Sequence, residues 1–446
     1  MTKVSPARIA APALALQLVF GAPLAAQNAS PPPMDHEMHG AAQDVMMRAR
    51  EGSGTSWLPD ESPMSGLQAT MGTWTLVLHG NAFLQYVDEP GPRGGSQLGS
   101  LNWLMGMARR PLLSGTFGLR AMLSGEPFTI PRCGYPVLLA SGESCEGKPH
   151  DVQHPHDLFT ELAAEYTRQL LPALDFHLYA ALAGEPALGP VAFPHRSSAI
   201  PNPLAPISHH WFDGSHVTFG VVSGGFYGER WKLEGSLFNG RAPDEDRLDL
   251  DLAPLTSYAG RLWWLPDERW AVQLSAGRFN EAPGSAPAEQ DHLVRYTTSA
   301  TYHRRSDAGG LWATTAAAAR SGVGASAANA LLLESSVTLR GRHTVYGRAE
   351  WAELSEVSGH RHGQPTGSPQ APVRAAGVLA LGYALHLKAS HGLALGVGAR
   401  TSVTLLPTQL EPIYGGRNPV GFAVFLNLRP SEHVMETMQM PMGGQR

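Results

Sequence analysis

The sequence predicts an all-β protein, a transmembrane up-and-down antiparallel β-barrel of about 16 strands with an irregular N-terminal periplasmic segment. Three observations predict this fold. Apolar and polar residues alternate within short segments, the connections between these segments are by turns short and long, and no apolar run after the N-terminal leader is long enough for a membrane-spanning helix. Outer-membrane barrels have short periplasmic turns and longer outer loops, so the sequence places the chain in the bacterial outer membrane.

The alternation is clearest in residues 74–86, where the even positions are mostly apolar and the odd positions include His79 and Gln85. Alternation with a period of two indicates a strand with two different faces. Three further segments separate in the same way: residues 174–182, 231–239 and 331–339. A soluble β-sandwich also alternates, so the connections must decide between the two folds.

The connections divide into tight turns and longer loops that follow one another in strict alternation. The tight turns are residues 109–111, 171–173, 227–229, 266–268, 306–309, 341–342 and 389–390. The longer connections are residues 88–99, 124–155, 184–214, 240–255, 281–291, 321–328, 355–372 and 407–419. A soluble propeller is the alternative, but its blades would repeat with a shared signature, and we find no such repeat. The even strand count brings both ends of the barrel to the periplasmic side.

The chain divides into four parts. Residues 1–26 have the positive start, apolar centre and small-residue end of a signal peptide, with an ordinary N-terminal helix as the alternative. Residues 27–72 form a Met- and His-containing periplasmic segment or plug, residues 73–429 the outer-membrane barrel, and residues 430–446 a Met-rich tail.

The two cysteines, Cys133 and Cys145, both fall in the second long connection. Disulfides form in exported proteins, and the close spacing of these two residues predicts one disulfide within an outer loop. A catalytic or metal-binding role for the cysteines is the alternative.

Charged residues recur on the face of the strands opposite the apolar face. Charges that face lipid are costly, so we expect these side chains to line the lumen. The set is His79, Arg120, Glu161, Glu165, His177, Lys232, Glu234, Arg295, Arg348, Glu350 and Arg400. Because both signs occur without a ring of one sign, the set predicts no clear ion selectivity, and mutual neutralisation is the alternative to an open channel. The formal net charge of −5 gives no basic surface for nucleic acid.

Histidine and methionine gather in two places. Imidazole, thioether and carboxylate groups are ligands for copper or zinc, and thioethers favour Cu(I). The loop set is His154, His156, Asp157, His209, His210 and His216, and the terminal set is Met34, His36, Met38, His39, Met435, Met438, Met440 and Met442. The alternatives are a loop held folded by imidazole hydrogen bonds, and tails that bind nothing.

Three segments carry a resemblance to a known group of proteins: residues 52–59 (GSGTSWLP), residues 153–159 (QHPHDLF) and residues 209–211 (HHW). With these segments the chain resembles a family of exported bacterial proteins that are taken for outer-membrane β-barrels and have no established activity. The resemblance implies porin-like architecture and membrane lipid as a partner, but architecture does not imply function.

The function that the sequence predicts is a channel for a small solute, with a transition-metal ion as a candidate. The first alternative is a barrel-anchored copper- or zinc-binding protein without an open pore. The second is an outer-membrane hydrolase, which ranks last because no Ser–His pair stands in a recognisable motif; we therefore predict that the chain is not an enzyme. The sequence carries no signal for an oligomeric state.

Overall fold

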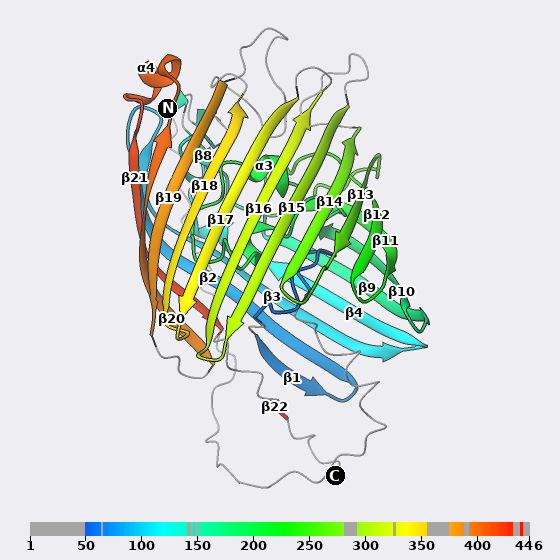
Figure 1. The fold of residues 1–446 in the computed structure, drawn as a ribbon. Helices are drawn as coiled ribbons and strands as arrows, with labels where there is room; N and C mark the ends of the chain where they lie inside the picture. The colour runs from blue at the N-terminus through cyan, green and yellow to red at the C-terminus, as the bar shows by residue number, and fades with distance from the viewer. Residues whose placement is uncertain are drawn as a thin grey trace, which may run out of the picture.

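The computed structural model describes residues 50–63, 66–140, 144–145, 148–149, 151–280, 292–323, 327–354, 374–387, 392–430 and 438–439. Sixteen antiparallel strands form a closed barrel (Figure 1), which confirms the predicted fold. The strands are β2 (Trp74–Glu89), β3 (Gly95–Leu112), β4 (Gly115–Leu123), β9 (Phe159–Leu171), β10 (Leu174–Gly184), β11 (Thr218–Tyr227), β12 (Trp231–Phe238), β13 (Ser257–Trp264), β14 (Trp270–Phe279), β15 (Leu293–Ser306), β16 (Gly310–Gly322), β17 (Ala328–Leu339), β18 (His343–Leu354), β19 (Arg374–His386), β20 (Leu393–Leu405) and β21 (Val420–Pro430).

Each strand pairs with the next along the chain, and β21 pairs with β2 to close the barrel. Closure leaves no open sheet edge, which is the condition for a sheet to cross hydrocarbon. Two short strands lie beyond the barrel: β1 (Leu67–Met71) forms a hairpin with β2, and β22 (Met438–Gln439) pairs in parallel with β1. No helix among the described residues is long and apolar enough to span a membrane.

The first two connections differ from their predicted positions. Cross-strand pairing between β2 and β3 continues as far as Glu89 and Gly95, so the predicted long connection 88–99 is a tight turn at residues 90–94. The turn predicted at residues 109–111 lies at residues 113–114, where Leu113 has a φ of 53°. Residues 109–111 have partners in β4, which shows that the Arg–Arg–Pro sequence extends the strand instead of ending it.

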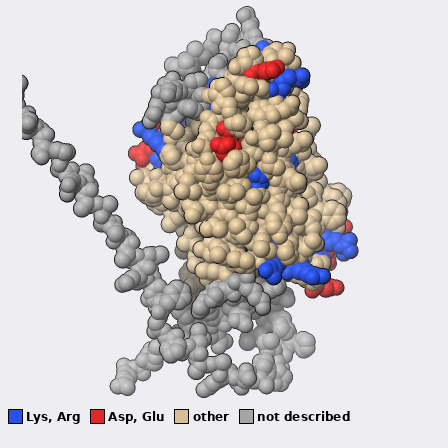
Figure 2. Space-filling view, turned by 90° about the vertical axis from the view of Figure 1, so that its left-hand side faces the viewer, with Lys and Arg blue, Asp and Glu red and all other residues tan. Residues whose placement is uncertain are grey.

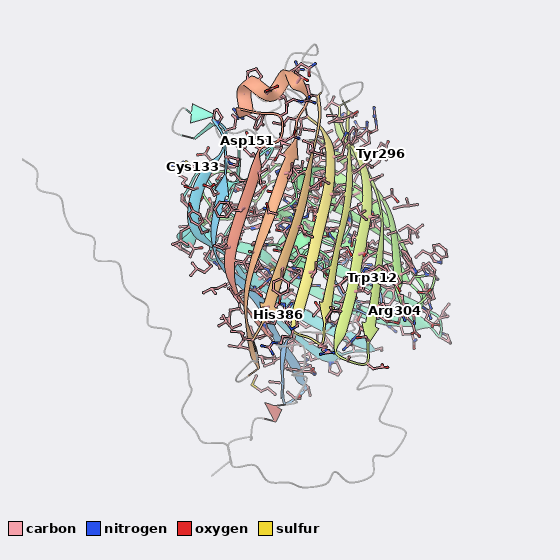
Figure 3. All side chains as sticks on the ribbon, turned by 60° about the vertical axis from the view of Figure 1, so that its left-hand side comes forward. Cys133, Asp151, Tyr296, Arg304, Trp312 and His386 are labelled. Carbon is pink, nitrogen blue, oxygen red and sulfur yellow. The ribbon has the colours of Figure 1, made fainter. Side chains whose placement is uncertain are left out.

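The outer surface of the barrel is apolar. Along the strands, buried positions alternate with exposed or half-buried ones, and many of the exposed side chains are large and apolar, as at Leu331 and Leu333 of β17, each 52% exposed. On the face drawn in Figure 2, most charged side chains lie near the ends of the barrel and the band between them is largely uncharged. Tyr296 lies toward one end of the wall and Trp312 toward the other (Figure 3), as in the aromatic girdles of membrane barrels. This surface requires lipid, and the protein is a β-barrel of the bacterial outer membrane.

Three segments enter or cover the bore. The plug segment, residues 50–63, lies at the end with the short turns, where Arg50 donates to the carbonyl of Glu229. The inward loop, residues 185–217, contains η2 (Phe193–His195) and α3 (His209–Phe212), and α3 packs against β15 and β16. The mouth loop, residues 124–158, contains α2 (Glu126–Thr129) and the short strands β5 (Tyr135–Pro136), β6 (Ser144–Cys145), β7 (Lys148–Pro149) and β8 (Val152–Gln153).

The outer mouth is covered by apolar packing between loops. Leu138 of the mouth loop, Leu204 of the inward loop and Tyr414 of α4 (Glu411–Tyr414), which follows η4 (Thr408–Leu410), are buried in one cluster. Asp151 of the mouth loop connects this loop to the β2–β3 turn and to α4, because it accepts hydrogen bonds from Arg93 (2.7 Å) and from the Tyr414 hydroxyl (2.6 Å).

Several predictions fall outside the described residues. These are the signal peptide and most of both tails, including Met34, His36, Met38, His39, Met435, Met440 and Met442; of Met438, only the backbone is described. The described residues contain no free cysteine. The side chain of Cys145 is not described, so its disulfide with Cys133 stays a prediction.

The apolar band gives the first testable prediction. Leu333→Arg places a cation on the lipid face near the middle of β17, and we expect it to lower the free energy of unfolding by roughly 2–4 kcal/mol. The matched control is Leu339→Arg at the end of the same strand, where the cost falls to about 0–1 kcal/mol. Reversible denaturant unfolding from lipid vesicles measures both values. Equal costs at the two positions would contradict a membrane-embedded wall.

Candidate functional site

The plug segment and the inward loop meet inside the barrel. The amide of Ala192 donates to Ser53 Oγ (2.8 Å), and Trp57 packs with Val191 and Trp263. The barrel wall also holds the plug segment, since Arg120 donates to the carbonyl of Gly54 (2.6 Å). These contacts join the two insertions into a single filling of the bore.

The inward loop is fixed by a buried arginine. The Arg196 guanidinium is fully buried and donates to Glu334 of β17 (2.5 Å) and to Asp213 (3.2 Å). Asp213 also accepts from the amide of Phe193 (2.7 Å) and from His209 Nδ1 (2.8 Å). Burial alone would raise the pKa of Asp213, but His209 and Arg196 hold the pKa of this carboxyl below its usual range.

The residues expected to line the lumen lie on the inner face of the wall, where most of them form ion pairs. Arg120 contacts Glu161 (3.3 Å), and Lys232 contacts Glu234 (3.1 Å). Arg109, which the sequence did not single out, bridges Glu165 and Glu51 of the plug segment. The remaining members of the predicted set are also buried or partly buried: His79, His177, Arg295, Arg348, Glu350 and Arg400. Among the described residues, charges of both signs alternate along the inner wall, and most of them are paired.

Three adjoining cavities lie along the inward loop, and a fourth, of about 410 Å³, lies beside the plug segment next to Arg109, Glu165 and Lys232. The outer cavity, about 80 Å³, is lined by all six predicted loop residues, namely His154, His156, Asp157, His209, His210 and His216. The middle cavity, about 30 Å³, shares His156 and His216 with the outer one. The inner cavity, about 120 Å³, shares Trp103 and His195 with the middle one and reaches Gln68 and Pro430 at the short-turn end.

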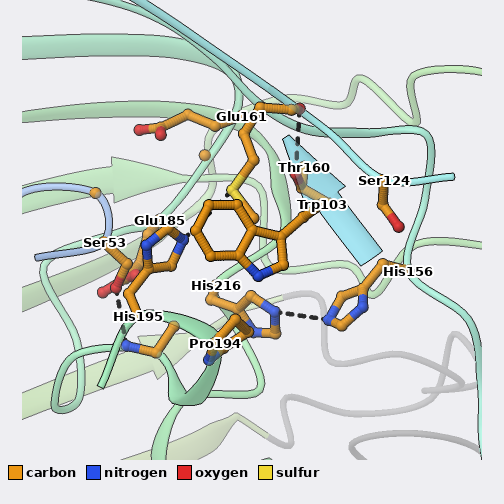
Figure 4. A pocket seen from close by; sticks show the side chains of 14 residues that line it. Ser53, Trp103, Ser124, His156, Thr160, Glu161, Glu185, Pro194, His195 and His216 are labelled. Carbon is orange, nitrogen blue, oxygen red and sulfur yellow. Dashed lines mark hydrogen bonds between the residues drawn. The ribbon is translucent and has the colours of Figure 1, made fainter. Parts of the chain in front are cut away.

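His156 and His216 form the tightest histidine contact between these cavities. Their Nε2 atoms lie 3.0 Å apart (Figure 4). His156 Nδ1 contacts a carboxylate oxygen of Glu126 in α2 (2.9 Å), and His216 Nδ1 contacts the carbonyl oxygen of Asp213 (2.7 Å). Burial would lower the pKa of His156, but the Glu126 carboxylate outweighs it and raises this pKa. Burial and the neighbouring histidines lower the pKa of His216 to about 3.

One thioether, that of Met122, lines the middle cavity. His195 Nε2 lies 3.4 Å from Met122 Sδ, and the His195 ring contacts the ring of Trp103 (centroids 4.6 Å apart). Met122 is buried with Met105 and Met107 of β3. The lining therefore changes from imidazole at the outer end to imidazole and thioether further in.

The remaining loop residues are held by local contacts. His154 Nδ1 contacts the carbonyl oxygen of Pro155 (2.9 Å), and Asp157 contacts Arg247 (3.4 Å). Burial raises the pKa of Asp157 to about 6. Among the described residues, only Asp244, Asp249 and Asp251 bring three imidazole, thiol or carboxylate ligand atoms within 4.8 Å of one another, and they lie in the loop between β12 and β13. The loop histidines therefore share a cavity without forming a closed three-ligand site.

Sequence reasoning missed the residues that support the histidines. Glu126, Asp213 and Met122 come from three separate segments, and their roles depend on loops that fold back into the barrel. One signal was present for the methionines: Met105 and Met107 are two residues apart on the inward face of β3, and Met105 pairs with Met122.

A serine–histidine pair bears on the hydrolase alternative. Ser62 Oγ lies 2.8 Å from His303 Nδ1, and the same hydroxyl donates to the carbonyl of Pro59. His303 Nε2 has no hydrogen-bond partner in the described part of the chain, so no acid orients the ring. Ser62 is 1% exposed, which leaves no room for a substrate beside it. This Ser–His pair is therefore not arranged for nucleophilic attack.

Comparison with known proteins gives likeness in fold alone. No family model matches the chain, and no curated protein matches it. The outer membrane channel DcaP of Acinetobacter baumannii is 10% identical over 82% of this chain and 100% of its own, with a TM-score of 0.46. An anion-selective porin from Comamonas acidovorans is 10% identical over 80% and 99% of the two chains, with a TM-score of 0.47. Salmonella typhi OmpF in complex with daunomycin is 10% identical over 81% and 100%, with a TM-score of 0.49.

The ion pair between Arg196 and Asp213 gives the second prediction. Asp213→Asn removes the charge that holds Arg196 and His209 and turns a donor toward the amide of Phe193, so the inward loop should loosen. We expect larger and noisier single-channel currents than in the wild type. Asp246→Asn, in the exposed part of the β12–β13 loop, is the control and should leave the currents unchanged. Identical currents in all three proteins would show that the inward loop does not limit the pore.

Proposed function

We propose that this barrel is a narrow outer-membrane channel for a small cationic solute and that the solute is a transition-metal ion. The observation that carries the proposal is the row of three adjoining cavities, in which each boundary includes at least one histidine side chain. His156 and His216 stand between the outer and middle cavities, and His195 stands between the middle and inner ones.

The size of the cavities supports a small solute. The plug segment and the inward loop fill most of the bore, and the middle cavity measures about 30 Å³. A water molecule needs a cavity of roughly 10–15 Å³ on this measure, so the middle cavity has room for one or two waters or one ion. A sugar or a nucleotide would not pass without displacement of the inward loop.

The chemistry of the lining supports a metal ion. Most charged side chains of the wall form ion pairs with one another, as in the pairs Arg120–Glu161 and Lys232–Glu234. Imidazole and thioether groups are the ligands that remain along the path, and these suit copper. Conduction requires several sites of moderate strength in a row, so that an ion can enter and leave each of them.

A barrel-anchored metal-binding protein without a conducting pore is the second candidate, and the packing of the plug segment favours it. Trp57 is buried against Val191, and its ring faces the cations of Arg50 (5.0 Å) and Lys232 (5.4 Å). A segment held this firmly would keep the bore shut unless it moves. The two candidates differ in whether current passes.

The third prediction separates the two candidates. The wild-type protein in a planar bilayer should show small single-channel steps that micromolar copper or zinc blocks, because the metal would reside at the histidine boundaries. Trp57→Ala should enlarge the steps by loosening the plug segment. Trp231→Ala, at an exposed position on the outer wall, is the control. A silent bilayer with inserted wild-type and Trp57→Ala proteins would reject the channel and leave the anchored metal-binding protein.

A further inference from the structure

The hydrogen-bond partners of His156 and His216 determine which nitrogen of each ring carries a hydrogen. Glu126 Oε2 accepts a hydrogen bond from the backbone amide of His156 (2.8 Å) and contacts Nδ1 of the same residue (2.9 Å). Because a carboxylate oxygen can only accept hydrogen bonds, Nδ1 must carry the hydrogen. His216 Nδ1 faces the carbonyl oxygen of Asp213, which also only accepts. Each ring therefore carries its hydrogen on Nδ1, and each neutral ring has its lone pair on Nε2.

The two Nε2 atoms face each other at 3.0 Å. Two lone pairs at this distance repel, so a positively charged species must lie between them: either one shared proton or a metal cation. A ligating histidine almost always donates its second nitrogen to a carboxylate or a backbone carbonyl, which fixes the ring for the metal. Glu126 and the carbonyl of Asp213 provide both of these arrangements.

We propose that the middle cavity binds a single soft cation with the chemistry of Cu(I), held by Nε2 of His156 and Nε2 of His216, in a cavity that the Met122 thioether also lines. The proposal rests on the function proposed above and names the ion and its site. Binding would displace the shared proton from the gap between the two rings.

The distances fit such ligands. With metal–nitrogen bonds of about 2.0–2.1 Å and metal–sulfur bonds of about 2.3 Å, two ligand atoms at a tetrahedral angle lie roughly 3.3–3.5 Å apart. The His156–His216 contact of 3.0 Å needs to open by only a few tenths of an ångström to reach this spacing. His195 and Met122 line the same cavity of about 30 Å³, and Figure 4 shows the three histidines around it.

Met122 decides between a soft and a harder ion. A thioether suits Cu(I), whereas Zn²⁺ sites in proteins use thiolate, imidazole and carboxylate ligands. The described loop histidines and carboxylates lack a third ligand atom within 4.8 Å of the His156–His216 pair, so these residues offer a cation two nitrogen ligands.

The fourth prediction is a binding titration of the detergent-solubilised, full-length protein. Cu(I) is titrated under reducing conditions against a coloured Cu(I) chelator, and Zn²⁺ is titrated separately. Because the terminal methionines and histidines can also bind metal, the quantity measured is the difference between proteins. The double variant His156→Ala/His216→Ala should lose one equivalent of Cu(I) relative to the wild type. His343→Ala, at an exposed histidine near a short turn, is the control and should lose none.

The conservative variant Met122→Leu preserves the packing with Met105 and Met107, so it tests the ligand set without unfolding the barrel. We expect it to weaken Cu(I) binding about tenfold or more, in the range seen when supporting groups of metal sites are changed, and to leave Zn²⁺ binding unchanged. Equal stoichiometry in the wild type and the double variant overturns the site. Equal losses of Cu(I) and Zn²⁺ in Met122→Leu overturn its assignment to a soft ion. The titration needs no conduction, so a protein that binds Cu(I) in a silent bilayer keeps the site and loses only the channel.

Discussion

The lipid around the barrel is the constraint on which the rest of the structure depends. Strands that cross hydrocarbon must turn their charged side chains toward the bore, because a charge at the middle of the lipid face is costly. In this chain the charged side chains that face the bore need ion-pair partners, and some of these partners belong to the plug segment and the inward loop. Glu51 of the plug segment contacts Arg109, and Arg196 of the inward loop contacts Glu334. The inward-facing charges of the wall therefore help to hold the plug segment and the inward loop inside the bore.

The filling in turn determines what the barrel can transport. A sixteen-stranded barrel is wide enough for an aqueous channel, but here the plug segment and the inward loop leave cavities of about 30 to 120 Å³ along the histidine path. Most of the charged side chains pair with one another, and the imidazoles of His156, His216 and His195 stand at the cavity boundaries. Under the proposed function, coordination chemistry and not net charge would select the solute.

The fold could be predicted from the sequence because the alternation of apolar and polar residues and the spacing of turns are local signals. Lipid outside the barrel enforces this alternation, because outward-facing positions must be apolar. The strand count and the inward set of charges follow from a period of two, which a one-residue slip would reverse. The errors were also local: residues 109–111 resemble a turn, but pairing with β4 extends the strand through them. The loop histidines could be named from the sequence, whereas their geometry could not. The contact of His156 with His216 depends on how two long loops fold back into the bore, and Glu126 and Met122 reach the site from separate segments.

The most direct test of the account is a flux measurement on proteoliposomes that contain the wild-type protein. Uptake of Cu(I), delivered as a weak complex, is compared with uptake of sucrose, and protein-free liposomes give the background. We predict that Cu(I) enters faster than the background and that sucrose does not. Entry of sucrose at a rate comparable to Cu(I) would show a general pore and contradict the narrow path. Entry of neither would show that the filled barrel does not conduct.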